Sequence, residues 1–87
     1  MNREPETVII TVGYYEKNIF VDMEIPGEVT VNVLKNKILE ILRNIYEGIF
    51  TEWTEYNIAF NNRFLHDDET LISAGAYEGS YLYVSKK

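Results

Sequence analysis

Residues 30–46 decide the fold, and they read TVNVLKNKILEILRNIY. Apolar residues recur in this stretch at the spacing of an α-helix, and polar residues fall between them. The expected buried stripe consists of Val31, Leu34, Ile38, Ile41, Leu42 and Ile45. Thr30 suits an N-cap because its hydroxyl can accept from a first-turn N–H, and Gly48 suits a left-handed residue at the end. The stretch therefore predicts one core helix with a solvent-exposed face.

The sequence before this helix predicts a β-hairpin. Residues 7–14 form a strand pattern with Val8, Ile10 and Val12 on one face, and residues 19–25 show the clearest alternation of the chain. The polar residues 15–18 form the turn between them. Pro26-Gly27 ends the second strand because proline lacks the N–H that a strand ladder needs. The side chains expected to point inward are Val8, Ile10, Val12, Ile19, Val21, Met23 and Ile25.

The sequence after the helix predicts shorter strands. Residues 48–55 have no regular period, and we interpret Phe50 and Trp53 in this loop as a lid on the core, with a partner contact by Trp53 as the alternative. Residues 56–60 form a strand, Asn61-Asn62 a hairpin turn because asparagine tolerates positive φ, and residues 63–65 a short return strand. One helical turn follows at 70–73, and 81–85 is the last strand. The predicted class is α+β, a mixed sheet of four to five strands packed on one helix.

Composition limits the kinds of function. A chain of 87 residues supports one core, so we expect a disordered N-terminus over 1–6 and a single domain over 7–87. The net charge of −6 and the scattered basic residues argue against nucleic acid as a partner. Cysteine is absent, which removes disulfides and thiolate catalysis. No apolar run reaches the roughly 20 residues of a membrane span, so we expect no membrane insertion and a cytoplasmic location.

The segment His66-Asp67-Asp68-Glu69 is the one cluster that suggests metal binding or acid–base chemistry. Nucleophilic catalysis would need a nucleophile and a base positioned together in a pocket, and the sequence supplies no second element for this. We therefore interpret the segment as a solvated turn. The expectation is a non-enzymatic protein with no catalytic residues, no cofactor and no metal.

Several segments resemble ubiquitin in their order and spacing. Residues 57–71, NIAFNNRFLHDDETL, are similar to the third strand, turn and acidic loop of ubiquitin-like proteins, and 79–84, GSYLYV, to their last strand. Residues 34–38, LKNKI, are similar to the start of the ubiquitin helix. The resemblance covers about residues 7–85 and implies the ubiquitin-like β-grasp fold. It also implies that Lys35 faces Asp67, so we expect their charged atoms within about 4 Å of each other.

Within that superfamily the chain most resembles the YukD/EsaB family. The similar features are the chain length, the hairpin exit at 22–26 leading to Val31, and an end at Lys86-Lys87 directly after the last strand. This resemblance implies an accessory or regulatory component of bacterial type VII secretion that docks non-covalently on another protein, with a membrane-anchored secretion component as a candidate. The alternative is a ubiquitin-like modifier or sulfur carrier, which would need a Gly-Gly tail beyond Lys87.

The outward face of the predicted sheet is the candidate binding site. Aromatic side chains there would provide a large rigid contact area at low entropy cost. In ubiquitin the corresponding face carries the apolar patch that partners contact, whereas here Ala59 and Ser85 replace two aliphatic residues. Simple cross-strand pairing is the alternative, and a homodimer through this face stays open. The predicted partner-binding residues are Ile9, Phe20, Ala59, Tyr81 and Tyr83.

Overall fold

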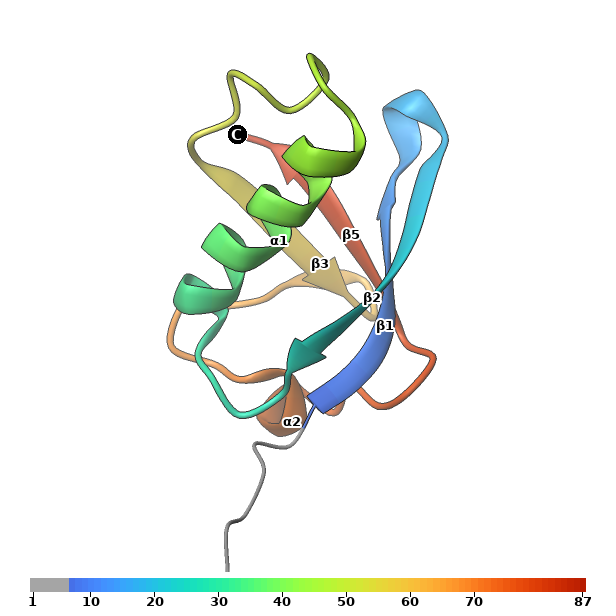
Figure 1. Ribbon diagram of the computed structural model, residues 1–87. Helices are drawn as coiled ribbons and strands as arrows, with labels where there is room; N and C mark the ends of the chain where they lie inside the picture. Colours follow the sequence, from blue (N-terminus) through green and yellow to red (C-terminus); the bar gives the residue numbers. More distant parts are fainter. Residues whose placement is uncertain (1–6) are drawn as a thin grey trace, which may run out of the picture.

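One long helix lies across a five-stranded sheet (Figure 1). The computed structural model describes residues 7–87, so the segment 1–6, predicted to be disordered, lies outside the described residues. The strands are β1 (Thr7–Tyr14), β2 (Ile19–Pro26), β3 (Tyr56–Phe60), β4 (Arg63–Phe64) and β5 (Tyr81–Lys86). The helical elements are the 3-10 turn η1 (Tyr15–Lys17), α1 (Val31–Ile45) and the short α2 (Leu71–Ala74).

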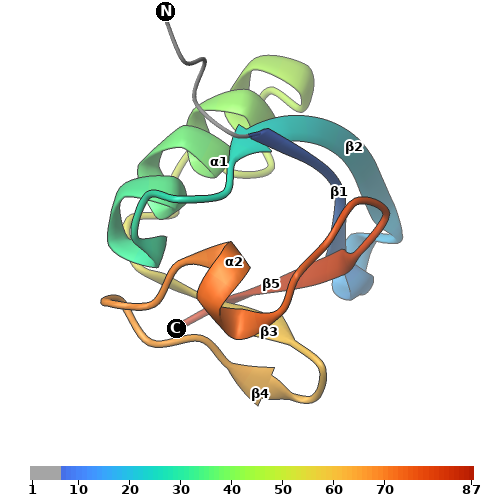
Figure 2. The same ribbon diagram turned by 90° about the horizontal axis from the view of Figure 1, so that it is seen from below.

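The sheet is mixed, with the strand order β2-β1-β5-β3-β4. The first and last strands, β1 and β5, run parallel in its centre, and every other pair is antiparallel. Seen from below, the strands curl around the side on which α1 lies (Figure 2). This arrangement confirms the predicted α+β class. Among the described residues 7–87, no helix covers the opposite face of the sheet.

The core lies between the sheet and α1. The inward residues predicted for β1 and β2 are buried, except that Val21 is half-buried against the core. The helix stripe differs from the prediction at three positions: Leu39 is buried, Ile41 is half-buried, and Ile45 is 52% exposed. Ile45 is the last helical residue, and burial of the stripe ends one turn earlier at Leu42.

The start of α1 is capped differently from the prediction. The Thr30 hydroxyl makes no capping hydrogen bond. Instead the Val31 N–H donates to the Glu69 carbonyl at 2.7 Å, and the Asn32 N–H donates to the Asp67 carbonyl at 3.0 Å. The loop before α2 thus satisfies first-turn N–H groups that a side-chain cap would otherwise serve. At the other end, Tyr46 closes the helix, and Gly48 has the expected left-handed conformation at φ +88°.

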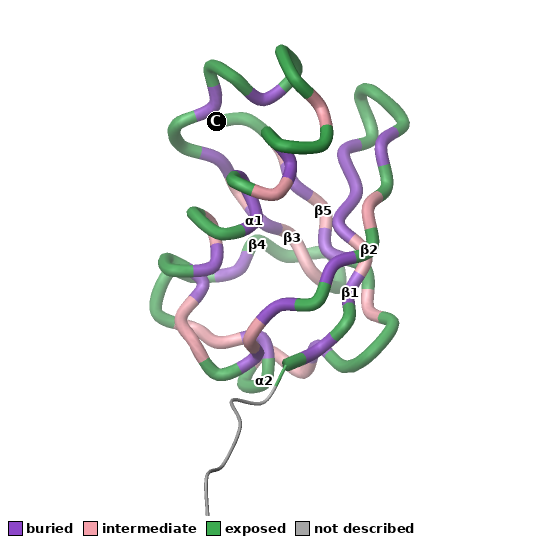
Figure 3. The backbone as a smooth tube through the Cα atoms, viewed as in Figure 1, coloured by how far each residue is buried: buried purple, intermediate pink, exposed green. Residues whose placement is uncertain are grey.

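The connection after α1 is largely exposed but is fixed at two buried points (Figure 3). Phe50 and Trp53 are almost fully buried, with ring centroids 5.0 Å apart, which confirms the interpretation of this loop as a lid on the core. Arg43, a residue of α1, anchors the loop. Its Nε donates to the Phe50 carbonyl at 3.1 Å, and its Nη2 donates to the Trp53 carbonyl.

Both predicted turns in the last third are present. Asn61 and Asn62 have φ of 54° and 67°, the conformation of a two-residue hairpin loop between β3 and β4. Thr70 caps α2: its hydroxyl accepts from the Ser73 N–H, and the Thr70 N–H donates to the Ser73 hydroxyl, each at 3.0 Å. These local signals, which depend on few residues, were readable from the sequence.

Candidate interaction surface

One row of residues crosses the outer face of the sheet, the face turned away from α1. The strand register pairs Gly13 with Phe20 on one side and with Tyr83 on the other. Tyr83 in turn pairs with Ala59, and Ala59 pairs with Phe64. We call these residues the outer row: Phe20, Gly13, Tyr83, Ala59 and Phe64. Each of the five strands therefore contributes one residue to the outer row.

Two further tyrosines extend the outer row into an aromatic stack. The rings of Tyr15 and Tyr83 are stacked with centroids 4.7 Å apart and an interplanar angle of 12°. Tyr81 is nearly parallel to Tyr83, at 6.3 Å and 9°, and Phe20 meets Tyr15 edge to face at 6.0 Å. The hydrogen bond with the Tyr15 hydroxyl, together with burial, raises the pKa of Tyr83. The result is an ordered aromatic surface.

Gly13 keeps the outer row continuous. A Cβ atom at this position would lie 2.9 Å from Cε1 of Phe20 and 3.1 Å from Cδ1 of Tyr83. Both rings therefore close over the glycine backbone, and Gly13 itself is buried although it lies on the outer face. A larger residue would separate the rings.

The structure places all five predicted binding residues on the outer face, in different degrees of exposure. Phe20 and Tyr81 are 43% and 52% exposed, whereas Ala59 and Tyr83 are half-buried. Ile9 is also exposed, but it is four residues from Gly13 along β1 and lies outside the outer row. Their role in binding stays a prediction.

Sequence reasoning missed three members of this surface: Gly13, Tyr15 and Phe64. Tyr15 continues the alternation of outward residues along β1, and Phe64 alternates with the buried Leu65, so a periodic signal existed for both. Phe64 is 58% exposed and forms part of a shallow hollow of about 300 Å³ with Ala59, Asn62 and Arg63. The outer row therefore ends in a small depression at β4.

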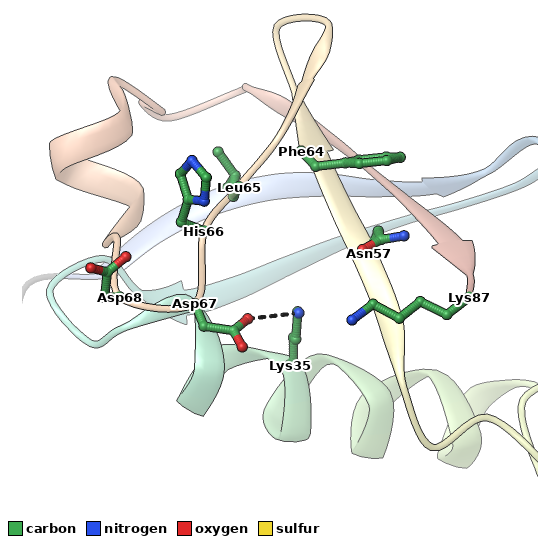
Figure 4. A pocket seen from close by; sticks show the side chains of 8 residues that line it. All are labelled: Lys35, Asn57, Phe64, Leu65, His66, Asp67, Asp68 and Lys87. Atoms are coloured by element: carbon green, nitrogen blue, oxygen red, sulfur yellow. Dashed lines mark hydrogen bonds and ion pairs between the residues drawn. The ribbon is translucent and has the colours of Figure 1, made fainter.

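A second hollow, of about 460 Å³, lies on the other side of Phe64 (Figure 4). It contains the predicted ion pair, with Lys35 Nζ 2.8 Å from Asp67 Oδ1, which confirms that contact. The hydrogen bond and charge of Lys35, with smaller effects of Lys87 and His66, hold the pKa of Asp67 below its usual value. In Figure 4 the Lys87 side chain extends toward this pair. The pair joins the acidic turn to α1.

The acidic turn is held by a second ion pair as well. Arg63 donates to Glu69 through Nη1 at 2.9 Å and Nη2 at 2.5 Å, and the His66 N–H donates to Glu69 at 2.6 Å. These contacts lower the pKa of Glu69 to about 2. Two of the turn's carboxylates thus anchor the loop that caps α1. No group of three or more potential metal-ligating side chains is found within residues 7–87.

None of the helices in the described range 7–87 has the length and apolar character required to cross a membrane.

The sheet order, the crossing helix and the parallel central strands define a ubiquitin-like β-grasp domain. No protein-family model matches the chain, and no curated protein matches it by sequence. Among solved structures, it is similar to the ubiquitin-like domain of the Mycobacterium tuberculosis type VII secretion protein EccD1, at 20% identity and a TM-score of 0.76. That match covers 93% of this chain and 99% of the other.

Two further solved structures show the same similarity. The EccD5 ubiquitin-like domain from Mycobacterium xenopi matches at 11% identity and a TM-score of 0.77, covering 95% of this chain and 97% of that one. A chain of the MycP5-free ESX-5 inner membrane complex matches at 17% identity and a TM-score of 0.73. That match covers 95% of this chain but 21% of the other, so this domain corresponds to a small part of that protein.

Proposed function

We propose that this domain is a non-enzymatic protein–protein interaction module of bacterial type VII secretion, of the YukD/EsaB kind. It acts in the cytoplasm and docks non-covalently on a component of the membrane-embedded machinery. The observation that carries the proposal is the aromatic surface formed by the outer row with Tyr15 and Tyr81. The fold-level similarity to EccD ubiquitin-like domains supports the choice of secretion system.

The outer row has the composition of a binding surface. Aromatic side chains dominate the energetics of protein interfaces because they bury large rigid areas. Here they stack on one another, so their rotamers are already restricted before a partner arrives. A preordered surface loses less entropy on binding. The uncovered face of the sheet, with no helix packed on it among residues 7–87, leaves these rings accessible.

A pull-down from native cells tests this proposal. The purified chain and a Tyr81→Ser/Tyr83→Ser variant serve as baits, and mass spectrometry identifies captured proteins after native and after denaturing washes. We expect the wild-type chain to retain a type VII secretion component under native washes only, and the folded variant to lose it. Ser85→Ala, on the same face but without a ring, is the control that should bind normally.

Two results would contradict the proposal. Equal capture by the folded double variant would remove the outer row from binding. Adducts that survive denaturation through the C-terminus would instead support the modifier or carrier alternative.

A further inference from the structure

We propose that the partner segment that docks on the outer row is basic, with an apolar side chain on the rings and a lysine or arginine on Asp22 and Glu24. This inference rests on the proposed function and adds the chemistry of the partner. It comes from the charges that flank the rings on the same face of the sheet, and it commits to a protein partner rather than a second copy of this chain.

Asp22 and Glu24 lie beside the aromatic surface on the outer face of β2. Asp22 pairs with Thr11, which pairs on its other side with Tyr81, so this carboxylate lies in the row next to the rings. Glu24 follows two residues further along β2. At the rise of a β-strand, these positions are about 7 Å and 13 Å from Phe20, within the width of one docked segment.

Both carboxylates are held in place on the face. The Thr11 hydroxyl donates to Oδ1 of Asp22 at 2.6 Å, and the Thr7 hydroxyl donates to Oε1 of Glu24 at 2.8 Å. A carboxylate has about four acceptor positions, so one hydroxyl leaves most of each group free for a further donor. The two threonines therefore orient acceptors toward a ligand without neutralising them.

In the described range 7–87, neither Asp22 nor Glu24 forms an ion pair with a cation. The ion pairs found there are Lys35 with Asp67 and Arg63 with Glu69, and neither involves β2. The outward strand positions described above contain no lysine or arginine. Glu78 adds a further carboxylate at this end, where its Oε1 accepts from the Ile9 N–H at 2.8 Å. The face is therefore apolar and aromatic with an anionic border.

Charge complementarity decides which kind of partner fits the outer face of the sheet. A second copy docking face to face would bring an anionic border against another, which disfavours association. A segment with lysine or arginine meets opposite charge at the border. Its cation also gains from the exposed faces of the tyrosines, because aromatic rings attract cations over their faces. The surface thus fits a basic segment with an apolar anchor.

Titration of the 15N-labelled full chain by NMR tests this with two defined peptides. One carries leucine and tryptophan among arginines, and the other has the same sequence with glutamates in place of the arginines. The chain is used as wild type, as Asp22→Asn/Glu24→Gln, and as Glu40→Gln/Glu47→Gln. The last variant removes the same number of charges from exposed positions at α1 and just after it. The Tyr81→Ser/Tyr83→Ser variant tests whether peptide binding requires the aromatic rings of the outer face.

We expect the arginine peptide to shift amide signals of β1, β2 and β5, and the glutamate peptide to bind far more weakly. The affinity of the arginine peptide should fall about fivefold for Asp22→Asn/Glu24→Gln, as expected for the loss of two exposed ion pairs. For Glu40→Gln/Glu47→Gln it should fall less than about twofold. Equal losses in the two variants would overturn the inference, because they would mean general attraction to an acidic protein.

Other outcomes separate this inference from the proposed function. Binding that depends on Tyr81 and Tyr83 but not on Asp22 and Glu24 overturns the basic partner and leaves the docking face in place. Binding that depends on neither pair contradicts both. Signal changes on the outer face with protein concentration alone would indicate self-association, which also overturns the choice of partner.

Discussion

At the scale of single residues, Gly13 controls the geometry of the outer row. Its backbone conformation is not one that needs glycine, so the requirement comes from the two rings that lie over it. Glycine in a strand costs roughly 0.5–1 kcal/mol relative to alanine. Glycine is therefore needed at position 13 because the two rings leave no room for a side chain.

Gly13→Ala should change the surface and preserve the fold. A methyl group 2.9 Å from Phe20 and 3.1 Å from Tyr83 must displace at least one ring, while the strand backbone accepts alanine. We expect the side-chain proton signals of both rings to shift in NMR spectra, with a urea midpoint close to that of the wild type. Ser85→Ala is the matched control on the same face. Unchanged ring signals would show that Gly13 does not control the outer row.

At the scale of elements, the loop between β4 and α2 fastens the start of α1. Its backbone carbonyls cap the helix, and its carboxylates reach Lys35 on α1 and Arg63 on β4. Both carboxylates have a pKa below the usual value, chiefly because of the hydrogen bonds from Lys35 and Arg63. Ionisation of the Asp67 and Glu69 carboxylates is thus linked to folding.

The linkage predicts how stability depends on pH. Because the folded pKa of Glu69 is about 2, against an ordinary value of 4.5, its contribution is complete above pH 4.5 and is lost as the pH falls toward 2. Glu69→Gln should therefore lower the free energy of unfolding at pH 7, and its difference from wild type should shrink between pH 4.5 and 2. Urea unfolding over that range measures this. Glu55→Gln, at an exposed position, is the control. A difference that stays constant with pH would contradict the linkage.

At the scale of the whole molecule, periodic and local signals predicted most of the fold. The helix, the strand alternation, the Asn61-Asn62 turn and the helical turn at α2 each depend on residues close in sequence. The Lys35 contact with Asp67 was reached through resemblance. By contrast, the backbone cap of α1 and the anchoring of the lid by Arg43 join distant segments. No local pattern encodes such contacts.

The candidate site was predicted in part for the same reason. Alternation places a residue on the outer face, but strand order decides which outward residues become neighbours. The row that joins Phe20 to Tyr83 across Gly13 depends on the parallel pairing of β1 with β5. The outer face could therefore be predicted from the sequence, whereas the continuous row required the structure.

The central proposal is that the outer row docks on the secretion machinery. Site-specific photo-crosslinking in native cells tests it most directly. A benzophenone amino acid replaces Tyr81 in one strain and Glu40, on the exposed side of α1, in another. After irradiation, we predict that the adduct from position 81 contains a component of the type VII membrane complex and that position 40 yields none. The same adducts from both positions, or only a second copy of this chain at position 81, would contradict the proposal.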